Sequence, residues 1–182
     1  MLDDGIRRVC LLGAESTGKT TMAEALARRF GTVWVPEYGR GYTEVAREPG
    51  SPWRSDELVH IVRIQGWLER ELESQARRVL VCDTDAFTTS VFHDVLVGGA
   101  QPAGLRDAVA RERYDLFLLC GTDVPFVQDG WRDERARTRL EMHERYRRFL
   151  EERRERWLLL EGDHETRLAT ASAAVEALLA GG

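Results

Sequence analysis

The sequence has 182 residues, enough to bury one substantial core and short for two, so we expect a single domain, residues 1–182, with one active site. Hydrophobic residues make up 43% and charged residues 31%, a balance that excludes a disordered or fibrous chain. The net charge of −5 disfavours nucleic acid as a partner, because phosphate backbones bind net basic surfaces. No stretch approaches the length that spans a bilayer, so we expect a cytoplasmic protein without a membrane partner and leave its oligomeric state open.

Short apolar runs rich in β-branched residues alternate with longer segments of helical period, which is typical of a parallel sheet covered by helices. The predicted strands are residues 9–12, 32–35, 79–82, 116–120 and 157–160. All five are continuous apolar runs, as expected for strands that are buried on both faces. The predicted fold class is therefore α/β, with a five-stranded, mostly parallel sheet flanked by helices on both faces. The cysteines Cys10, Cys82 and Cys120 lie inside or at the end of these runs, so we expect reduced core thiols.

Three helices are clear from the apolar pattern between and after these strands. The first follows residues 9–12 and ends at Gly31, a residue type that favours helix termination. The second opens at Ser55 and carries an apolar stripe with one polar member, Gln65. The last is the Ala-rich segment 165–179, and residues 98–104 are predicted to form a turn.

The segment 129–156 is dense in charge of both signs, and its later part is predicted to be a solvated helix with one buried face. Glu141 with Arg145, and Glu144 with Arg148, have the spacing of ion pairs one helical turn apart. The predicted buried residues of this helix are Met142, Tyr146, Phe149 and Leu150.

Residues 13–20 read Gly-Ala-Glu-Ser-Thr-Gly-Lys-Thr and match the eight-residue phosphate-binding loop at every defined position. An apolar strand precedes the motif and a helix starts within it, which is the context that this loop requires. The glycines let the backbone wrap around phosphate groups, so that successive amides point at their oxygens from a helix N-terminus. The sequence therefore predicts a P-loop NTPase fold. The nucleotide contacts are expected from Gly13, Glu15, Ser16, Thr17, Gly18, Lys19, Thr20 and Thr21.

Lys19 is the single lysine among the 26 basic residues of the chain. A bias toward arginine of this kind would replace a lysine whose role arginine could fill, so the retention of Lys19 supports a specific role. We expect its ammonium group to reach the β- and γ-phosphates of ATP as a catalytic group, and the Thr20 hydroxyl to bind Mg²⁺.

Asp83 ends the predicted strand 79–82 at its carboxyl edge, where ligands of open α/β sheets bind. We assign it to the catalytic site as a second Mg²⁺ ligand. Asp85 follows two residues later and has two interpretations, which the sequence does not separate. It could orient metal-bound water or a substrate hydroxyl, or it could cap the helix that opens near Phe87.

The strand 32–35 is followed by Pro-Glu-Tyr-Gly-Arg, again at the carboxyl edge of the sheet. Glu37 is expected to accept a proton from an acceptor hydroxyl or to hold it by a hydrogen bond. Tyr38 could stack on a planar cationic ring, whereas Trp34 is interpreted mainly as a core residue. Arg40 and Gln65 are assigned to the same substrate site.

Residues 127–140 are predicted to form an arginine-bearing lid that closes over the triphosphate. Arg132 is assigned a catalytic role on the developing charge, and Arg135 is assigned to the nucleotide. We expect Arg137 and Arg139 to make salt bridges on a solvated helix instead.

These motifs resemble, over nearly the whole chain, the ribosylnicotinamide kinase domain of the NadR type. The resemblance rests on five blocks in the same order, which are residues 13–20, 37–40, 83–89, the pair Tyr114-Asp115 with 129–132, and 145–161. It implies ATP-dependent phosphorylation of the ribose 5'-hydroxyl of nicotinamide riboside to nicotinamide mononucleotide. The acids Glu37 and Asp85 and the ring of Tyr38 would then hold the positively charged substrate.

Two other functions remain open at this point. The first is a kinase for another nucleoside or small alcohol, which differs only in its acceptor pocket. The second is an ATP-binding regulatory ATPase that acts through a partner. A guanine-specific switch is disfavoured, because its usual Asn-Lys-x-Asp stretch needs a lysine other than Lys19.

Overall fold

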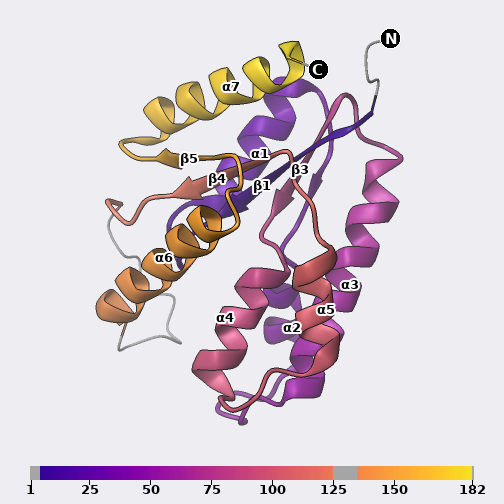
Figure 1. Ribbon diagram of the computed structural model, residues 1–182, viewed down its shortest axis with the longest axis vertical. Helices are drawn as coiled ribbons and strands as arrows, with labels where there is room; N and C mark the ends of the chain where they lie inside the picture. Colours follow the sequence, from indigo (N-terminus) through magenta and orange to yellow (C-terminus); the bar gives the residue numbers. More distant parts are fainter. Residues whose placement is uncertain (1–4, 125–134, 182) are drawn as a thin grey trace.

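The computed structural model describes residues 5–124 and 135–181, with only the backbone for residues 135–137. Its five strands form one sheet in the order β2-β3-β1-β4-β5, and every neighbouring pair is parallel. The α/β fold class predicted from the sequence is confirmed, and the sheet is fully parallel. Figure 1 shows the sheet as a twisted layer between two groups of helices. The strands are β1 (Arg7–Leu12), β2 (Trp34–Val35), β3 (Val79–Asp83), β4 (Leu116–Cys120) and β5 (Trp157–Leu160).

Continuous apolar runs form the central strands because both of their faces are buried. Val9 and Leu11 of β1 pack into a cluster on one face, whereas Cys10 and Leu12 pack into a cluster on the other. Strand β2 is shorter than predicted. The hydroxyl of Thr32 donates to Val79 O at 2.7 Å and accepts from Arg77 N at 2.9 Å, so a side chain takes the place of strand pairing there.

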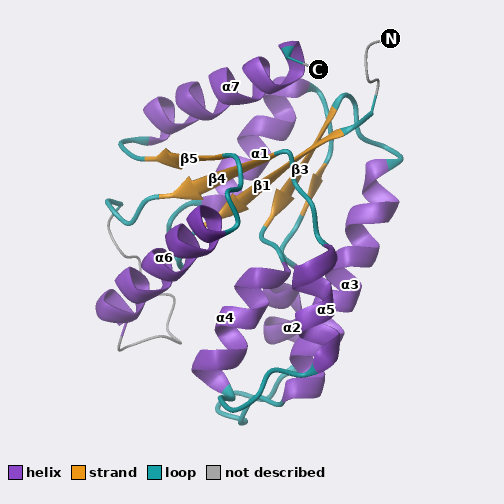
Figure 2. Ribbon diagram, viewed as in Figure 1, coloured by secondary structure: helices purple, strands orange, loops and turns teal. Residues whose placement is uncertain are grey.

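Two layers of helices cover the sheet (Figures 1 and 2). The helices α1 (Lys19–Phe30) and α7 (His164–Ala180) share one face and pack against each other. On the other face lie α3 (Ser55–Glu73), α4 (Ala86–Leu96) and α6 (Arg135–Glu152). The helix α5 (Ala103–Arg111) packs on α3 and α4, and α2 (Tyr38–Ala46) packs on α3. Trp34 packs against the core cluster under α1 and α7, as the core interpretation requires.

The helices α2 and α5 were not predicted. The sequence of α2 contains two glycines, each of which costs about 1 kcal/mol in a helix interior, and α2 has no buried residue. The nine residues of α5 bury Leu105 alone. Both helices are only nine residues long and depend on packing against α3 for support. The predicted turn 98–104 therefore ends earlier, with Gly98 and Gly99 at positive φ.

The buried face predicted for α6 is confirmed for Met142, Tyr146 and Leu150, but the predicted ion pairs are wrong. Arg147 pairs with Glu144 at 2.9 Å and with Glu151 at 2.6 Å, and Arg145 reaches Asp94 of α4 at 3.3 Å. Several pairings are available on so densely charged a helix surface, and helical spacing alone does not choose among them.

The three cysteines Cys10, Cys82 and Cys120 are free and buried, as predicted. Within the ranges 5–124 and 135–181, no helix combines the length and the apolar character needed to cross a membrane.

Candidate active site

The phosphate-binding loop leaves the carboxyl end of β1 with a backbone that only certain residues can adopt. Gly13 has a φ of 152°, and a Cβ on it would lie 2.7 Å from Thr17 Oγ1 and 3.0 Å from Cys120 O. Gly18 caps α1 in the left-handed region with a φ of 84°. Ser16 also has a positive φ, of 55°, which is uncommon for a residue with a side chain. The loop is thus a strained turn whose glycines are required by geometry.

Lys19 begins α1, and its side chain folds back over the loop. Its Nζ donates to the carbonyl oxygens of Gly13 and Ala14, each at 3.0 Å, and the residue is only 8% exposed. The hydroxyl of Thr17 donates to the same Ala14 carbonyl at 2.7 Å. The arrangement holds one positive charge at the mouth of a helix N-terminus, which suits a polyphosphate.

Thr20 and Asp83 meet beside the loop, and their chemistry fits Mg²⁺. Thr20 Oγ1 donates to Asp83 Oδ2 at 2.6 Å. Asp83 is fully buried and burial raises its pKa, opposed by the nearby charge of Lys19. Its other oxygen, Oδ1, has no hydrogen-bond partner among the described residues. Magnesium prefers oxygen ligands and is commonly bound by one or two carboxylates together with substrate phosphates, so the chemistry of these two residues fits such a site.

A cavity of about 630 Å³ opens beside the loop, between α2, α3, α4 and α6. Glu37, the N-cap residue of α2, lines this cavity together with Glu15 and Arg40. Arg40 Nε lies 3.8 Å from Glu37 Oε2. A second, smaller hollow is lined by Gly13 and Lys19 as well as by Glu37, so it joins the loop to the cavity. The lysine and the glutamate of the predicted site therefore face the same space.

The other predicted substrate residues have different environments. Gln65 of α3 lines the cavity, is 3% exposed and accepts a hydrogen bond from Tyr38 N at 2.9 Å through Oε1. Tyr38 is absent from the cavity lining among the described residues, and its ring packs near Tyr42 and His60 with centroids 6.2 and 5.8 Å away. Its contact with a substrate remains a prediction. The aromatic ring of the lining on this side belongs to Trp53.

Asp85 caps α4, which is one of its two predicted interpretations. Its Oδ1 accepts hydrogen bonds from Thr88 N at 2.8 Å and from Thr88 Oγ1 at 2.9 Å. Burial raises the pKa of Asp85 to about 6, although these hydrogen bonds act against the shift. Asp85 is 2% exposed and is not part of the described cavity lining, so a direct role on substrate remains a prediction. The neighbouring Thr84 does line the cavity and has a φ of 83°, a strained conformation of the kind that functional sites retain.

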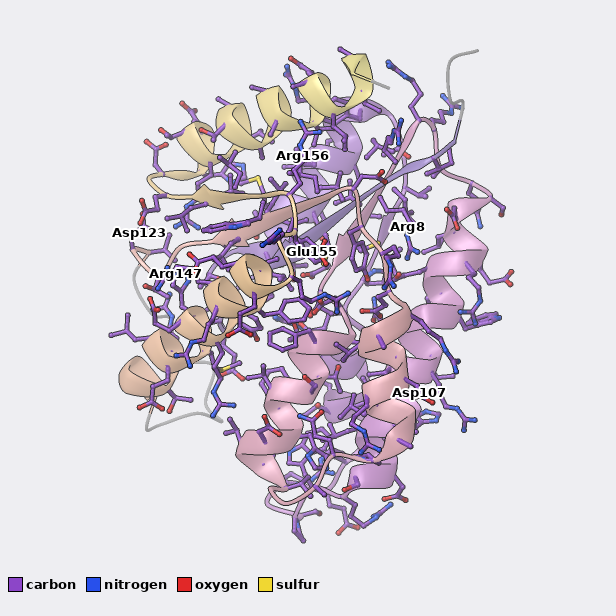
Figure 3. All side chains as sticks on the ribbon, viewed as in Figure 1. Arg8, Asp107, Asp123, Arg147, Glu155 and Arg156 are labelled. Carbon is purple, nitrogen blue, oxygen red and sulfur yellow. The ribbon has the colours of Figure 1, made fainter. Side chains whose placement is uncertain are left out.

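A buried polar cluster lies behind the cavity on the inner side of α3. Arg8 of β1, labelled in Figure 3, forms an ion pair with Glu69, and Tyr114 donates to Glu69 Oε1 at 3.0 Å. Burial raises the pKa of Glu69 to about 7, opposed by the charge of Arg8. Because Gln65 and Glu69 are one turn apart, a single helix connects α2 to the central strand.

The prediction of exposed salt bridges for Arg139 is wrong. Arg139 is 7% exposed, lines the cavity, and donates to Ser16 O at 3.4 Å and to Val124 O at 3.2 Å. The signal was present in the sequence, because Arg139, Met142 and Tyr146 lie on one helical face at i, i+3 and i+7.

The structure describes only some of the other residues that are predicted to bind the nucleotide. Glu15 lines the cavity, and Thr21 is exposed in the first turn of α1. Arg132 and most of the predicted lid lie outside the described residues. Arg135 begins α6, and its side chain is not described. Sequence reasoning did not identify Trp53, Phe92 or Met142 as lining residues, because apolar side chains of a cavity look like core residues in a sequence.

The chain is similar to NadR both in sequence and in structure. The trifunctional NAD biosynthesis/regulator protein NadR of Salmonella typhimurium strain LT2 is 32% identical over 134 residues. That alignment covers 70% of this chain and 31% of the relative, so the chain spans less than a third of that protein. A crystal structure of NadR in complex with NR has a TM-score of 0.77 at 27% identity, and covers 96% of this chain and 52% of its own. A second NadR structure, with NAD and AMP-PNP, has a TM-score of 0.75 at 27% identity, covering 96% and 50%.

Thymidylate kinase from Candida albicans shares the fold alone, with a TM-score of 0.64 at 11% identity over 95% of this chain and 92% of that one. The parallel sheet, the phosphate-binding loop and the buried Asp83 thus define a P-loop domain with the architecture of nucleoside and nucleotide kinases. The model of the family AAA_28, described as an AAA domain, matches residues 8–167. The chain belongs to this family.

Proposed function

We propose that this chain is an ATP-dependent kinase that phosphorylates the 5'-hydroxyl of nicotinamide riboside to give nicotinamide mononucleotide. The observation that carries the proposal is the shared space of Lys19 and Glu37, at the point where the phosphate-binding loop meets the large cavity. Phosphoryl transfer needs a cation at the transferred phosphate and an aligned hydroxyl on the other side. The two residues supply these two requirements, and both line one hollow.

The residues have separate roles in the proposed reaction. The loop amides and Lys19 bind the triphosphate, and Thr20 with Asp83 would hold Mg²⁺, which neutralises charge on the β- and γ-phosphates. Glu37 aligns the acceptor hydroxyl and accepts its proton. The hydroxyl oxygen forms a bond to the γ-phosphorus while the bond to the β,γ-bridging oxygen breaks, so that ADP leaves with that oxygen.

The chemistry of the cavity supports a cationic nucleoside as the acceptor. Nicotinamide riboside carries a positively charged pyridinium ring, and the carboxylates of Glu15 and Glu37 line the cavity. Trp53 offers an aromatic ring in the same lining. The similarity to NadR, whose crystal structure was obtained with NR, points to the same acceptor.

The test is a panel of acceptors with purified protein, ATP and magnesium. Nicotinamide riboside, adenosine, cytidine, uridine, thymidine and glycerol are compared by formation of ADP and of the phosphorylated product. We expect the highest kcat/KM for nicotinamide riboside. Faster turnover of another acceptor would replace the substrate but keep the kinase, whereas a low ATPase rate that no acceptor changes would favour the regulatory ATPase. GTP in place of ATP defines the phosphate donor.

A further inference from the structure

A buried arginine from the last helix contacts the back of the phosphate-binding loop. Arg167, in the first turn of α7, is 3% exposed, although 150 residues separate it from Thr17. Its Nη1 donates to the Thr17 carbonyl at 2.9 Å, and its Nε donates to the Gly162 carbonyl at 2.9 Å. Its Nη2 donates to Gly121 O at 3.3 Å and to the carboxylate of Asp123. One guanidinium group thus joins the loop to the segments that follow β4 and β5.

The partners of Arg167 are themselves fixed. Asp123, labelled in Figure 3 beyond the end of β4, also accepts a hydrogen bond from Gly162 N at 2.7 Å. Burial would raise the pKa of Asp123, but the hydrogen bond from Gly162 and the charge of Arg167 outweigh it and the pKa is lowered. A Cβ on Gly121 would lie 2.7 Å from Asp123 Oδ1 and 3.0 Å from Leu160 O, so this position requires glycine. The arginine is therefore held in one orientation.

The contact with Thr17 has a consequence for the amide that follows it. In a trans peptide the carbonyl of one residue and the N–H of the next point in opposite directions within one plane. Because the Thr17 carbonyl is turned to the buried Arg167, the N–H of Gly18 is turned away from the interior, toward the side from which a ligand approaches. Gly18 has a φ of 84°, and a glycine backbone has few steric limits of its own. The hydrogen bond to the preceding carbonyl supplies the orientation.

A second buried arginine adds to this arrangement. Arg139 donates to the carbonyl of Ser16, the residue before Thr17. Burial lowers the pKa of Arg139, and the charge of Arg167 lowers it further. The two arginines thus fix two successive carbonyl groups of the loop, Arg139 that of Ser16 and Arg167 that of Thr17.

We propose that Arg167 is a positioning residue for the triphosphate, which orients the Gly18 amide through the Thr17 carbonyl. The proposal rests on the nucleotide-binding part of the proposed function and is independent of the acceptor. Its ligand class is a nucleoside triphosphate or inorganic triphosphate, since the contacts act on the phosphate side alone.

The experiment compares Arg167→Met, Arg167→Lys and Arg29→Met by calorimetric binding of MgATP and of inorganic triphosphate without an acceptor. Arg29 is the matched control, because its ion pair with Glu176 at 2.9 Å joins α1 to α7 at an exposed position. We expect Arg167→Met to raise the dissociation constants about 10- to 100-fold, as for the loss of a charged hydrogen bond. Arg167→Lys should fall in between, because lysine keeps the charge and loses the planar set of donors. Arg29→Met should match the unmodified protein.

Three further measurements separate positioning from general destabilisation. The Gly18 amide resonance should move in Arg167→Lys and stay in Arg29→Met, and thermal unfolding reports whether each variant is folded. In turnover, KM for ATP should rise while KM for the acceptor is unchanged.

If Arg167→Met does not fold, the Arg167→Lys variant decides the outcome. The proposal is overturned if Arg167→Lys binds MgATP as tightly as the unmodified protein does. Equal losses in Arg167→Lys and Arg29→Met also overturn it. Neither result depends on whether nicotinamide riboside is the acceptor. This proposal can therefore fail while the proposed function stands, and it can hold if another acceptor is the substrate.

Discussion

The phosphate-binding loop and the acceptor side of the cavity are built in different ways. The loop lies among buried elements, and its carbonyls accept hydrogen bonds from Lys19, Arg139 and Arg167. The helix α2 on the acceptor side has no buried residue. It is held by polar contacts with α3. Tyr38 N donates a hydrogen bond to Gln65 Oε1 at 2.9 Å, and the Tyr42 hydroxyl donates to Glu57 Oε1 at 3.2 Å.

This difference separates the part of the site that every phosphoryl transfer needs from the part that selects a substrate. Buried hydrogen bonds to charged groups resist distortion, because each one lost leaves a desolvated polar group behind. The exposed side chains of α2, such as Arg40 and Glu44, make contacts that are individually weak and can be exchanged at small cost to the fold. Substitutions at the phosphate side should therefore abolish turnover, and those at the acceptor side should tune it.

The largest effect that tests this comparison is expected at the phosphate side. Lys19→Ala should lower kcat/KM by about a thousandfold or more, because it removes several kcal/mol of charge stabilisation from the transferred phosphate. Steady-state kinetics measure the loss, and Arg28→Ala on the exposed face of the same helix is the control. A residual rate within about tenfold of the unmodified protein would contradict the role of Lys19.

Asp83→Asn sharpens the comparison at the metal site. We expect kcat to fall by about 100- to 1000-fold and the magnesium concentration at half-maximal rate to rise, since a neutral amide is a poorer ligand than a carboxylate. The fold should tolerate the change, because burial already disfavours the ionised form of Asp83. Initial rates across a magnesium titration give the result. The exposed Asp107→Asn on α5 serves as control, and removal of divalent ions with a chelator should stop turnover in both proteins.

At the acceptor side, Glu37→Gln should lower kcat by about 10- to 100-fold while the dissociation constant for MgATP stays within about twofold. The amide keeps the shape of the side chain and can no longer accept a proton. Turnover and calorimetric ATP binding are measured on the same preparation, with Glu24→Gln as the control at an exposed position of α1, outside the cavity lining. A parallel loss of ATP affinity would break the separation between the two sides.

The smallest effect concerns Glu69, on the helix that connects both sides. Burial raises its pKa from 4.5 to about 7. Between these two pH values the carboxyl group is protonated in the folded state and ionised in the unfolded state. Stability from this group is present below pH 4.5 and is lost as the pH rises through about 7. Glu69→Gln should flatten this decline, on the order of 2 kcal/mol in the free energy of unfolding.

Urea unfolding at pH 5, 6, 7 and 8 measures the slope for Glu69→Gln. Asp85 contributes in the same range, with a pKa raised to about 6, so the readout is the difference between the variant and the unmodified protein. The control is Glu71→Gln, an exposed position on the same helix. Equal slopes in the variant and the unmodified protein would show that Glu69 is ionised throughout this range.

The sequence predicted the elements whose residues carry a strong local signal. Strands β4 and β5 have the predicted bounds because continuous apolar runs belong in a doubly covered sheet. The loop 13–18 was predicted from its glycines, since positive φ at Gly18 and close approach at Gly13 exclude other residues. The helices α2 and α5 were missed because each has only nine residues, too few to be stable without packing on α3.

The sequence by itself determined the parallel α/β fold, the phosphate-binding loop with Lys19, and the acids Glu37 and Asp83 at the carboxyl ends of β2 and β3. These features depend on local backbone geometry and on burial. Only the tertiary structure decided that Asp85 caps α4, that Arg139 is buried, and that Arg167 contacts Thr17. A guanidinium group on a helix looks like a solvated charge in the sequence unless its neighbours in space are known. The loop residues that these arginines contact, Ser16 and Thr17, lie more than a hundred residues away in the chain.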